Sequence, residues 1–191
     1  MRTALRPALV LLALLTALTG VVYPLAVTGL ASLLFPQRAH GSLLVTRDGA
    51  VIGSELVGQP FTDPRDFWGR PSAVHYDAST SGATNMGPLH PGLKAAVAQR
   101  IAALRAADPE ATLPVPADLV LASASGLDPH ISPAAAHYQA RRVARARGLP
   151  EGQVHALIGA HTEPPTLGFL DAPRVHVLRL NRALAELRPA P

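Results

Sequence analysis

The sequence predicts an α+β protein in which a single N-terminal transmembrane helix is followed by a small mixed extracytoplasmic domain. Three observations support this: an uncharged run over residues 8–35, apolar residues at helical spacing beyond it, and an Asp-Gly pair between two apolar segments. The 19 prolines, 15 glycines and 4% aromatic residues imply short elements joined by fixed turns around a core of Leu, Val, Ile and Ala.

Residues 8–35 are long enough to cross a membrane as a helix. At about 1.5 Å per residue the run reaches roughly 40 Å, and a hydrocarbon core measures about 30 Å. Pro24 removes one backbone donor, so we expect a kink there. The alternatives are a cleaved signal peptide, whose apolar region spans only about 7–15 residues, and a buried helix of a soluble core. We favour a retained anchor.

Charges around the run predict its orientation. Arg2 and Arg6 lie in the short N-terminal tail and favour its retention in the cytoplasm. The chain then divides into a cytoplasmic tail over residues 1–7, a transmembrane helix over 8–35 and an extracytoplasmic α+β domain over 36–191.

A hairpin and a long loop are predicted next. Residues 43–47 and 50–57 flank Asp48-Gly49, which favours a two-residue turn with both central residues at positive φ. Residues 63–88 have the composition of a loop, and such a long loop is usually functional or packed. The adjacent Phe67 and Trp68 favour packing, because exposed aromatic pairs are a liability.

Capping residues mark three helices. The first begins at Pro91 and ends at Asp108. The second follows Ser132 as N-cap and stops at Gly148. The third begins at Pro150.

The remaining elements are shorter. Asp118 is placed to cap a short turn, alternation over Val175–Leu180 predicts a strand, and residues 181–187 form a last helix.

The net charge of +4 is carried almost wholly by arginine, and Lys94 is the only lysine. Such a balance suits anionic lipid, an acidic partner or a nucleotide. Nucleic acid is disfavoured, because no basic stretch is interleaved with aromatic residues.

Four residues are candidates for contact with a nucleotide. Arg141, Arg142 and Arg145, followed by Arg147, give one helix a basic flank, which is either a solvated surface or a contact for phosphates. Gln59 ends a stretch similar to the end of the Leu-Ser-Gly-Gly-Gln signature of transport ATPases, although a strand end with a turn glycine explains it equally well.

Motifs for catalysis are missing from the sequence. It contains no phosphate-binding loop, no Asp-Lys-Thr-Gly, no H-E-x-x-H and no G-x-S-x-G, so we predict no catalytic residue and no metal site. Asp128 and His130 are the best acid–base or metal candidates, but two ligands do not make a metal site. We favour a structural role in which Asp128 binds backbone amides and His130 caps or packs. The alternative is a membrane-anchored extracytoplasmic hydrolase that uses Ser125, Asp128 and His130.

Three stretches of the chain, residues 67–72, 81–88 and 118–132, together resemble one family. They are similar to KdpC, the small subunit of the Kdp potassium-transporting P-type ATPase, and the resemblance covers nearly the whole chain. Ala83-Thr84 and His176 depart from the family pattern, which commonly has an asparagine at the latter position. The residues that match the family motifs, expected to be structural, are Trp68, Gly69, Arg70, Asn85, Ser123, Ser125, Gly126, Asp128 and His130.

The resemblance implies a non-catalytic accessory subunit of an ATP-driven, high-affinity potassium uptake complex in the bacterial plasma membrane. The implied partners are a channel-like potassium-binding subunit, a P-type ATPase subunit, a small single-span subunit and membrane lipid. The implied role is that of a catalytic chaperone, which raises the ATP affinity of the hydrolytic subunit and shares its ATP. Potassium is the ion transported by the complex and is not expected to bind this chain.

The predicted orientation disagrees with direct contact to ATP, because it places the domain away from the cytosol. An effect on the pump would then pass through packed transmembrane helices or the ion entrance, as an allosteric coupling.

Overall fold

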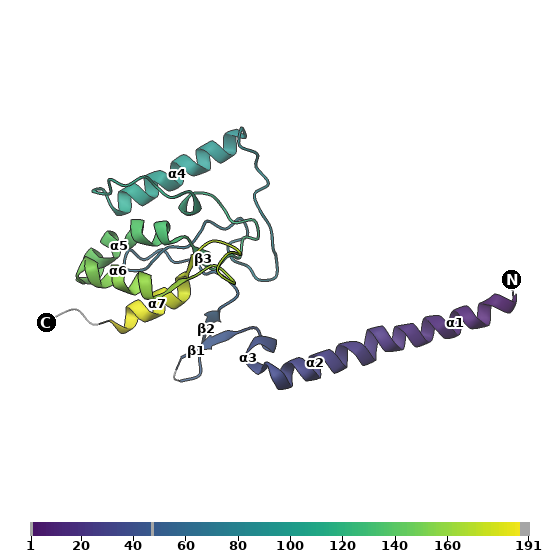
Figure 1. Cartoon of the computed structure of the whole chain (residues 1–191). Coiled ribbons are helices and arrows are strands. Elements are labelled where there is room, and N and C mark those ends of the chain that lie inside the picture. Colours follow the sequence, from purple (N-terminus) through teal and green to yellow (C-terminus); the bar gives the residue numbers. More distant parts are fainter. Residues whose placement is uncertain (1, 47, 188–191) are drawn as a thin grey trace. The chain divides into compact units, whose positions relative to one another are not determined.

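The computed structural model describes residues 2–46 and 48–187, and the chain divides into two compact units, Met1–Ser54 and Glu55–Pro191 (Figure 1). Met1, Arg47 and residues 188–191, which the predicted segments include, lie outside the described residues. The first unit holds the apolar helix and a hairpin, and the second holds the mixed domain, so the predicted fold class is confirmed.

The N-terminal unit begins with one long helix composed of α1 (Arg2–Ala17), the π-helical η1 (Leu18–Val22) and α2 (Tyr23–Leu34). The 31 residues Ala4–Leu34 are long and apolar enough to cross a membrane, and no part of their most apolar stretch is buried. The alternative of a buried core helix is therefore wrong. A π turn lies shortly before Pro24, the position at which the sequence predicts a kink; in it the N–H of Tyr23 donates to the carbonyl of Leu18.

A short helix, α3 (Pro36–Ala39), leads into the antiparallel hairpin of β1 (Leu43–Val45) and β2 (Val51–Ser54). The hairpin is confirmed, but its predicted two-residue turn is wrong. The N–H of Thr46 donates to the carbonyl of Ala50 (2.8 Å), so three residues form the loop. Gly49 takes φ +84° at its end, as in three-residue hairpins.

The second unit contains a three-stranded antiparallel sheet in the order β3 (His130–Ile131), β5 (Arg174–His176), β4 (Thr162–Glu163). Val175 on the central strand pairs with Ile131 on one side and Thr162 on the other. Both Val175 and Ile131 are buried, so the sheet contributes directly to the core.

Three helices match their predictions closely. They are α4 (Pro91–Ala107), α5 (Pro133–Arg147) and α6 (Glu151–Ala160). The Ser132 hydroxyl accepts a hydrogen bond from the N–H of Ala135 (3.0 Å) at the start of α5, and Gly148 ends it at φ +66°. These are the capping geometries that the sequence indicated.

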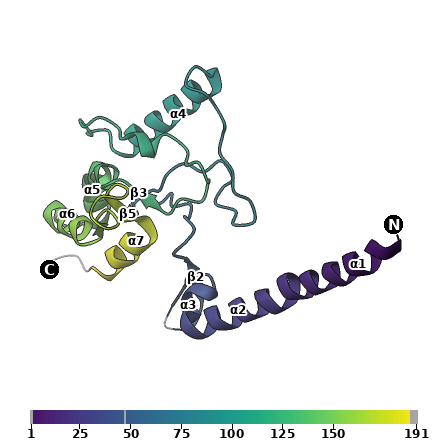
Figure 2. The ribbon, with the colours of Figure 1, turned by 45° about the vertical axis from the view of Figure 1, so that its right-hand side comes forward.

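Helix α5 is the centre of the core. Its buried face consists mainly of alanine and valine, which lets α6 pack beside it, and the last helix, α7 (Val177–Glu186), packs against α6 (Figure 1, Figure 2). The buried residues of these three helices include Ala136, Ala140, Val143, Val154, Ile158, Leu180 and Leu184.

The predicted strand Val175–Leu180 is correct only at its start. The strand ends at His176, and α7 begins at Val177. The ring of His176 caps this helix by accepting from the N–H of Arg179 (3.4 Å). Leu180 and Leu184 then face the core at helical spacing.

Residues 55–90 contain no helix or strand, as the predicted loop over 63–88 required. Phe67 is fully buried, which confirms that the aromatic pair packs. Asp118, in the 3₁₀ turn η2 (Ala117–Leu119), does not cap that turn. It instead accepts from the N–H of Ser132 (2.7 Å), ahead of α5.

Candidate functional site

The Phe67-Trp68 segment is held by two side-chain amides that imitate strand pairing. Asn181 of α7 accepts from the N–H of Phe67 (2.7 Å) and donates to its carbonyl (2.9 Å). Gln139 of α5 accepts from the N–H of Trp68 (2.8 Å) and donates to its carbonyl (3.1 Å). Both amides are buried, so they satisfy backbone groups that water cannot reach.

Arg142 is the third group that holds this segment. Its guanidinium lies 4.2 Å from the centroid of the Trp68 ring and donates to the carbonyls of Pro64 and Asp66 and to Gln139 Oε1. Burial lowers the pKa of Arg142 to about 10, so the group stays charged at neutral pH. A buried, charged guanidinium makes strong cation–π and charge-assisted contacts.

The other arginines of the predicted basic flank also have partners within the chain. Asp108, only 4% exposed, accepts from Arg141 Nη2 (3.1 Å) and Arg145 Nη2 (3.1 Å). Glu110 lies 3.7 Å from Nη1 of each. Arg147 pairs with Asp66 at 2.7 Å. Helix α5 thereby binds two distant segments of the chain.

Arg141 and Arg145 are partly solvated, with side chains 37% and 50% exposed, and both are paired with carboxylates of the chain. A phosphate at Arg141 and Arg145 would meet the carboxylates of Asp108 and Glu110, so these residues do not by themselves form a phosphate site. Gln59 lies elsewhere, directly after Gly58, whose amide donates to the carbonyl of residue 127. That these residues lie close to a nucleotide stays a prediction.

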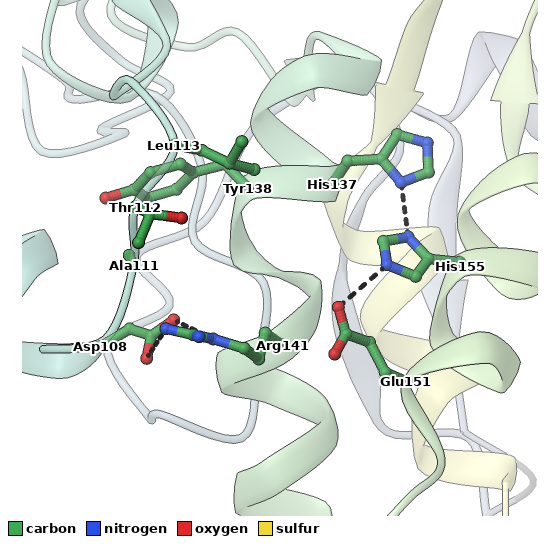
Figure 3. A pocket seen from close by; sticks show the side chains of 9 residues that line it. All are labelled: Asp108, Ala111, Thr112, Leu113, His137, Tyr138, Arg141, Glu151 and His155. Atoms are coloured by element: carbon green, nitrogen blue, oxygen red, sulfur yellow. Dashed lines mark hydrogen bonds and ion pairs between the residues drawn. The ribbon is translucent and has the colours of Figure 1, made fainter.

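A pocket of about 220 Å³ lies beside this arginine group and is bordered by two histidines (Figure 3). Nδ1 of His137 on α5 and Nδ1 of His155 on α6 are 2.7 Å apart, and Glu151 lies 3.2 Å from Nε2 of His155. Burial and the neighbouring His155 lower the pKa of His137. The three side chains form a short chain of hydrogen bonds that links α5 to α6.

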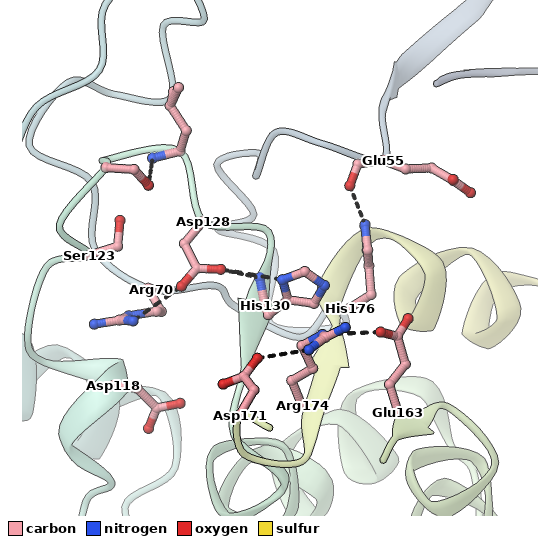
Figure 4. Close-up of polar contacts among 12 residues, drawn as sticks. Glu55, Arg70, Asp118, Ser123, Asp128, His130, Glu163, Asp171, Arg174 and His176 are labelled. Carbon is pink, nitrogen blue, oxygen red and sulfur yellow. Dashed lines mark hydrogen bonds and ion pairs between the residues drawn. The ribbon is translucent and has the colours of Figure 1, made fainter. Parts of the chain in front are cut away.

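Arg70, Asp128 and His130 meet beside a second, more open pocket of about 410 Å³ (Figure 4). Asp128 accepts from Arg70 Nη1 (3.1 Å) and from the N–H of His130 (3.0 Å). Burial opposes ionisation of Asp128, but the bonds from His130 and Arg70 prevail and lower its pKa. Asp128 therefore binds a local backbone amide, as expected, and also pairs with a guanidinium.

His130 packs edge-on against His176 of β5, with ring centroids 5.1 Å apart. His176 is 3% exposed, and its Nε2 lies 2.8 Å from the carbonyl of Glu55. Burial lowers the pKa of His176. The neutral ring thus donates to Glu55 while its other nitrogen caps α7.

The serines of the 118–132 stretch build turns. Ser123 Oγ accepts from the N–H of Gly126 (2.9 Å), and Ser125 Oγ accepts from the N–H of Leu127 (3.1 Å). No hydrogen bond joins Ser125 to His130 in the described part of the chain, so the pair that a serine hydrolase requires is not assembled.

Gly69 and Asn85, the remaining motif residues, hold the backbone of the loop. A Cβ at Gly69 would lie 3.0 Å from the hydroxyl oxygen of Tyr76, which donates to the carbonyl of Arg70. Asn85 takes φ +53°, a left-handed conformation that asparagine tolerates well.

Within residues 2–46 and 48–187, no group of three or more His, Asp or Glu side chains could hold a metal ion. The Asp128–His130 pair lacks a third ligand here, and so does the His137–His155 pair.

Comparison with known proteins assigns the family. A family model described as K+-transporting ATPase, c chain, matches residues 5–186. The chain belongs to the KdpC family. A potassium-transporting ATPase KdpC subunit of Variovorax paradoxus is 63% identical over 187 residues, covering 96% of both chains. The corresponding subunit of Polaromonas naphthalenivorans is 63% identical over 192 residues, covering 99% of this chain and 97% of its own. That of Herpetosiphon aurantiacus is 54% identical, covering 98% of both.

Sequence reasoning missed Gln139, Asn181 and the His137–His155 pair. The first two are polar residues on apolar helix faces, which is a signal for a buried hydrogen-bonding role. Glu151 and His155 stand at the i, i+4 spacing of a helical pair. No local pattern indicates that His137 joins them.

Proposed function

We propose that the chain is a non-catalytic accessory subunit of a potassium-transporting ATPase and takes part in potassium uptake. The observation that carries this proposal is the match of residues 5–186 to the KdpC family, together with relatives named as subunits of that ATPase. The single apolar helix Ala4–Leu34 supports a membrane-bound subunit.

The proposed topology places the N-terminus in the cytoplasm and residues 36–191 outside it, across the bacterial plasma membrane. Arg2 and Arg6 lie at the N-terminal end of the long helix and support this orientation. The proposed partners are a channel-like potassium-binding subunit, a P-type ATPase subunit and a small single-span subunit.

We further propose that the chain acts as a catalytic chaperone, raising the ATP affinity of the hydrolytic subunit without binding phosphates through Arg141 or Arg145. Both guanidiniums are paired with Asp108, which argues against direct contact. In the proposed topology ATP and the domain lie on opposite sides of the membrane. The effect on ATP affinity then reaches the hydrolytic subunit as a coupling free energy through the assembled complex.

The topology is testable by cysteine labelling, because the chain has no cysteine of its own. A membrane-impermeant maleimide should label Ser79→Cys in right-side-out vesicles and Ala4→Cys only in inverted vesicles; both positions are exposed. The reverse pattern would overturn the orientation.

The coupling is testable in the complex reconstituted with and without this chain. Omission should raise the KM for ATP of the potassium-stimulated ATPase activity. An unchanged KM and unchanged recovery of the other subunits would overturn the accessory role.

A further inference from the structure

Three large apolar side chains project from one short loop of the second unit. Leu167 is 78% exposed, Phe169 76% and Leu170 47%, all within the segment 164–170, which we call the apolar loop. Single exposed apolar residues are normal on a protein surface, but three adjacent ones form a patch that usually marks a contact.

The apolar loop has a defined shape. The N–H of Gly168 donates to the carbonyl of Pro165 (2.9 Å), and that of Leu170 donates to the carbonyl of Thr166 (2.9 Å). Leu167 takes φ +55°, a left-handed conformation that is unfavourable for leucine. The loop therefore holds a strained turn that displays its apolar side chains instead of folding them inward.

Arg174 closes the base of the loop. Its Nε donates to Glu163 Oε2 (3.1 Å) on one side, and its Nη1 donates to Asp171 Oδ2 (2.8 Å) on the other (Figure 4). Glu163 continues to Arg179 (3.1 Å), which in turn pairs with Glu55 (2.9 Å). These ion pairs fix both ends of the loop. Because the loop is already ordered, it loses less conformational entropy when it binds a partner.

The charges around the loop distinguish a protein partner from lipid. The carboxylates of Glu55, Glu163 and Asp171 outnumber the guanidiniums of Arg174 and Arg179 that pair with them, so the charged group at the base of the loop is negative on balance. Segments that bind membrane surfaces set basic residues beside Trp, Phe or Leu anchors, whereas the anchors here adjoin a group of charges that is negative on balance. The complementary surface is an apolar pocket with a neutral or basic rim.

We infer that the apolar loop inserts Leu167 and Phe169 into such a pocket on another protein subunit of the ATPase complex. This inference rests on the proposed function, because it needs a complex to dock on. The loop supplies apolar anchors at the centre of the contact, and the ion-paired side chains of Glu163, Asp171 and Arg174 form its charged rim.

Purification of the complex through a tag on another subunit tests the inference. Leu167→Ser combined with Phe169→Ser should reduce co-purification of this chain by at least about tenfold, as loss of central anchors does. The matched control is Leu89→Ser with Leu113→Ser, whose side chains are 86% and 62% exposed outside the loop. Equal recovery of both variants would overturn the inference.

Two further measurements separate the possible failures. The fluorescence of Trp68, the only tryptophan, should show the same unfolding midpoint for both full-length variants, which excludes misfolding. A photoreactive residue in place of Phe169 should form an adduct with another subunit; an adduct only with lipid or with a second copy of this chain would overturn the inference. Failure of the unsubstituted chain to co-purify would instead refute the proposed function.

Discussion

Asn181 and Phe67 lie 114 positions apart in the chain and exchange two hydrogen bonds through one side-chain amide and one backbone residue. Gln139 and Trp68 form a corresponding pair of hydrogen bonds. Side chains of α5 and α7 therefore bind the peptide groups of this loop in the way that a neighbouring β-strand would. The loop thereby buries Phe67 completely without leaving its peptide groups unpaired.

Asn181→Leu should destabilise the protein by about 2–5 kcal/mol, because it leaves the buried N–H and carbonyl of Phe67 without partners. Unfolding of the full chain in detergent by urea, followed by the fluorescence of neighbouring Trp68, measures this. The exposed Gln153→Leu on α6 is the control and should change stability by less than about 0.5 kcal/mol. Equal midpoints for the two variants would show that the amide clamp does not stabilise the fold.

Gly126→Ala should cost about 2–5 kcal/mol, considerably more than Gly148→Ala. Both glycines have a similar positive φ, +70° and +66°, so both variants incur a conformational cost of about 1–2 kcal/mol. Only at Gly126 would the new Cβ also meet Val74 Cγ2 at 2.6 Å and the carbonyl of Gly82 at 2.7 Å. The difference between the two thermal unfolding midpoints therefore measures the cost of the steric contact between the new Cβ at position 126 and Val74 and Gly82. Equal midpoints would contradict the existence of that contact.

His176 should make stability depend on pH between about 7.5 and 5.5. Its folded-state pKa is lowered, so the unfolded chain binds the proton more readily and stability falls as pH falls through the unfolded pKa of about 6.5. The groups that face the ring are His130 on β3, Glu163 on β4, Arg179 on α7 and Glu55.

The matched variant is His176→Asn, which retains a good capping residue but does not titrate. Its unfolding midpoint should fall less than that of the natural chain between pH 7.5 and pH 5.5. The titration of His137 is present in both chains and cancels in the comparison. Parallel pH profiles would exclude His176 as the source of the dependence.

Asp108→Asn should destabilise the protein by about 1–3 kcal/mol. The carboxylate is 5% exposed, whereas its partners Arg141 and Arg145 are 37% and 50% exposed, which reduces the loss expected for a fully buried pair. Glu110→Gln, 74% exposed and 3.7 Å from the same guanidiniums, is the control and should stay within about 0.5 kcal/mol. A urea titration in which both variants behave alike would contradict a structural role for Asp108.

Elements bounded by local chemistry were predictable from the sequence. Ser132 and Gly148 fixed both ends of α5, because a cap hydroxyl and a left-handed glycine act within one turn of the helix. The boundary at His176 was not predictable, since residues 175–180 fit both an alternating and a helical pattern. Burial of Leu180 and Leu184 in the core decides it, and burial in a core is not a local property.

Some residues of the site were predictable from the sequence, but their arrangement was not. The arginines of α5 were recognised as a basic flank, yet their acceptors come from segments more than 30 positions away. A periodic pattern shows which side of a helix carries charge but not which distant carbonyls or carboxylates meet it. The position of Arg142 over the Trp68 ring could therefore not be predicted from the sequence.

The π turn over Leu18–Val22 changes the directions in which the side chains of α2 point relative to those of α1. One additional residue in a turn rotates everything beyond it by about 100° about the helix axis. A line of side chains that follows one azimuth through α1 therefore continues at another azimuth through α2. Helices that pack against corresponding faces of α1 and α2 therefore approach from different directions. Deletion of Gly20 would remove the additional residue and align the side-chain faces of α1 and α2.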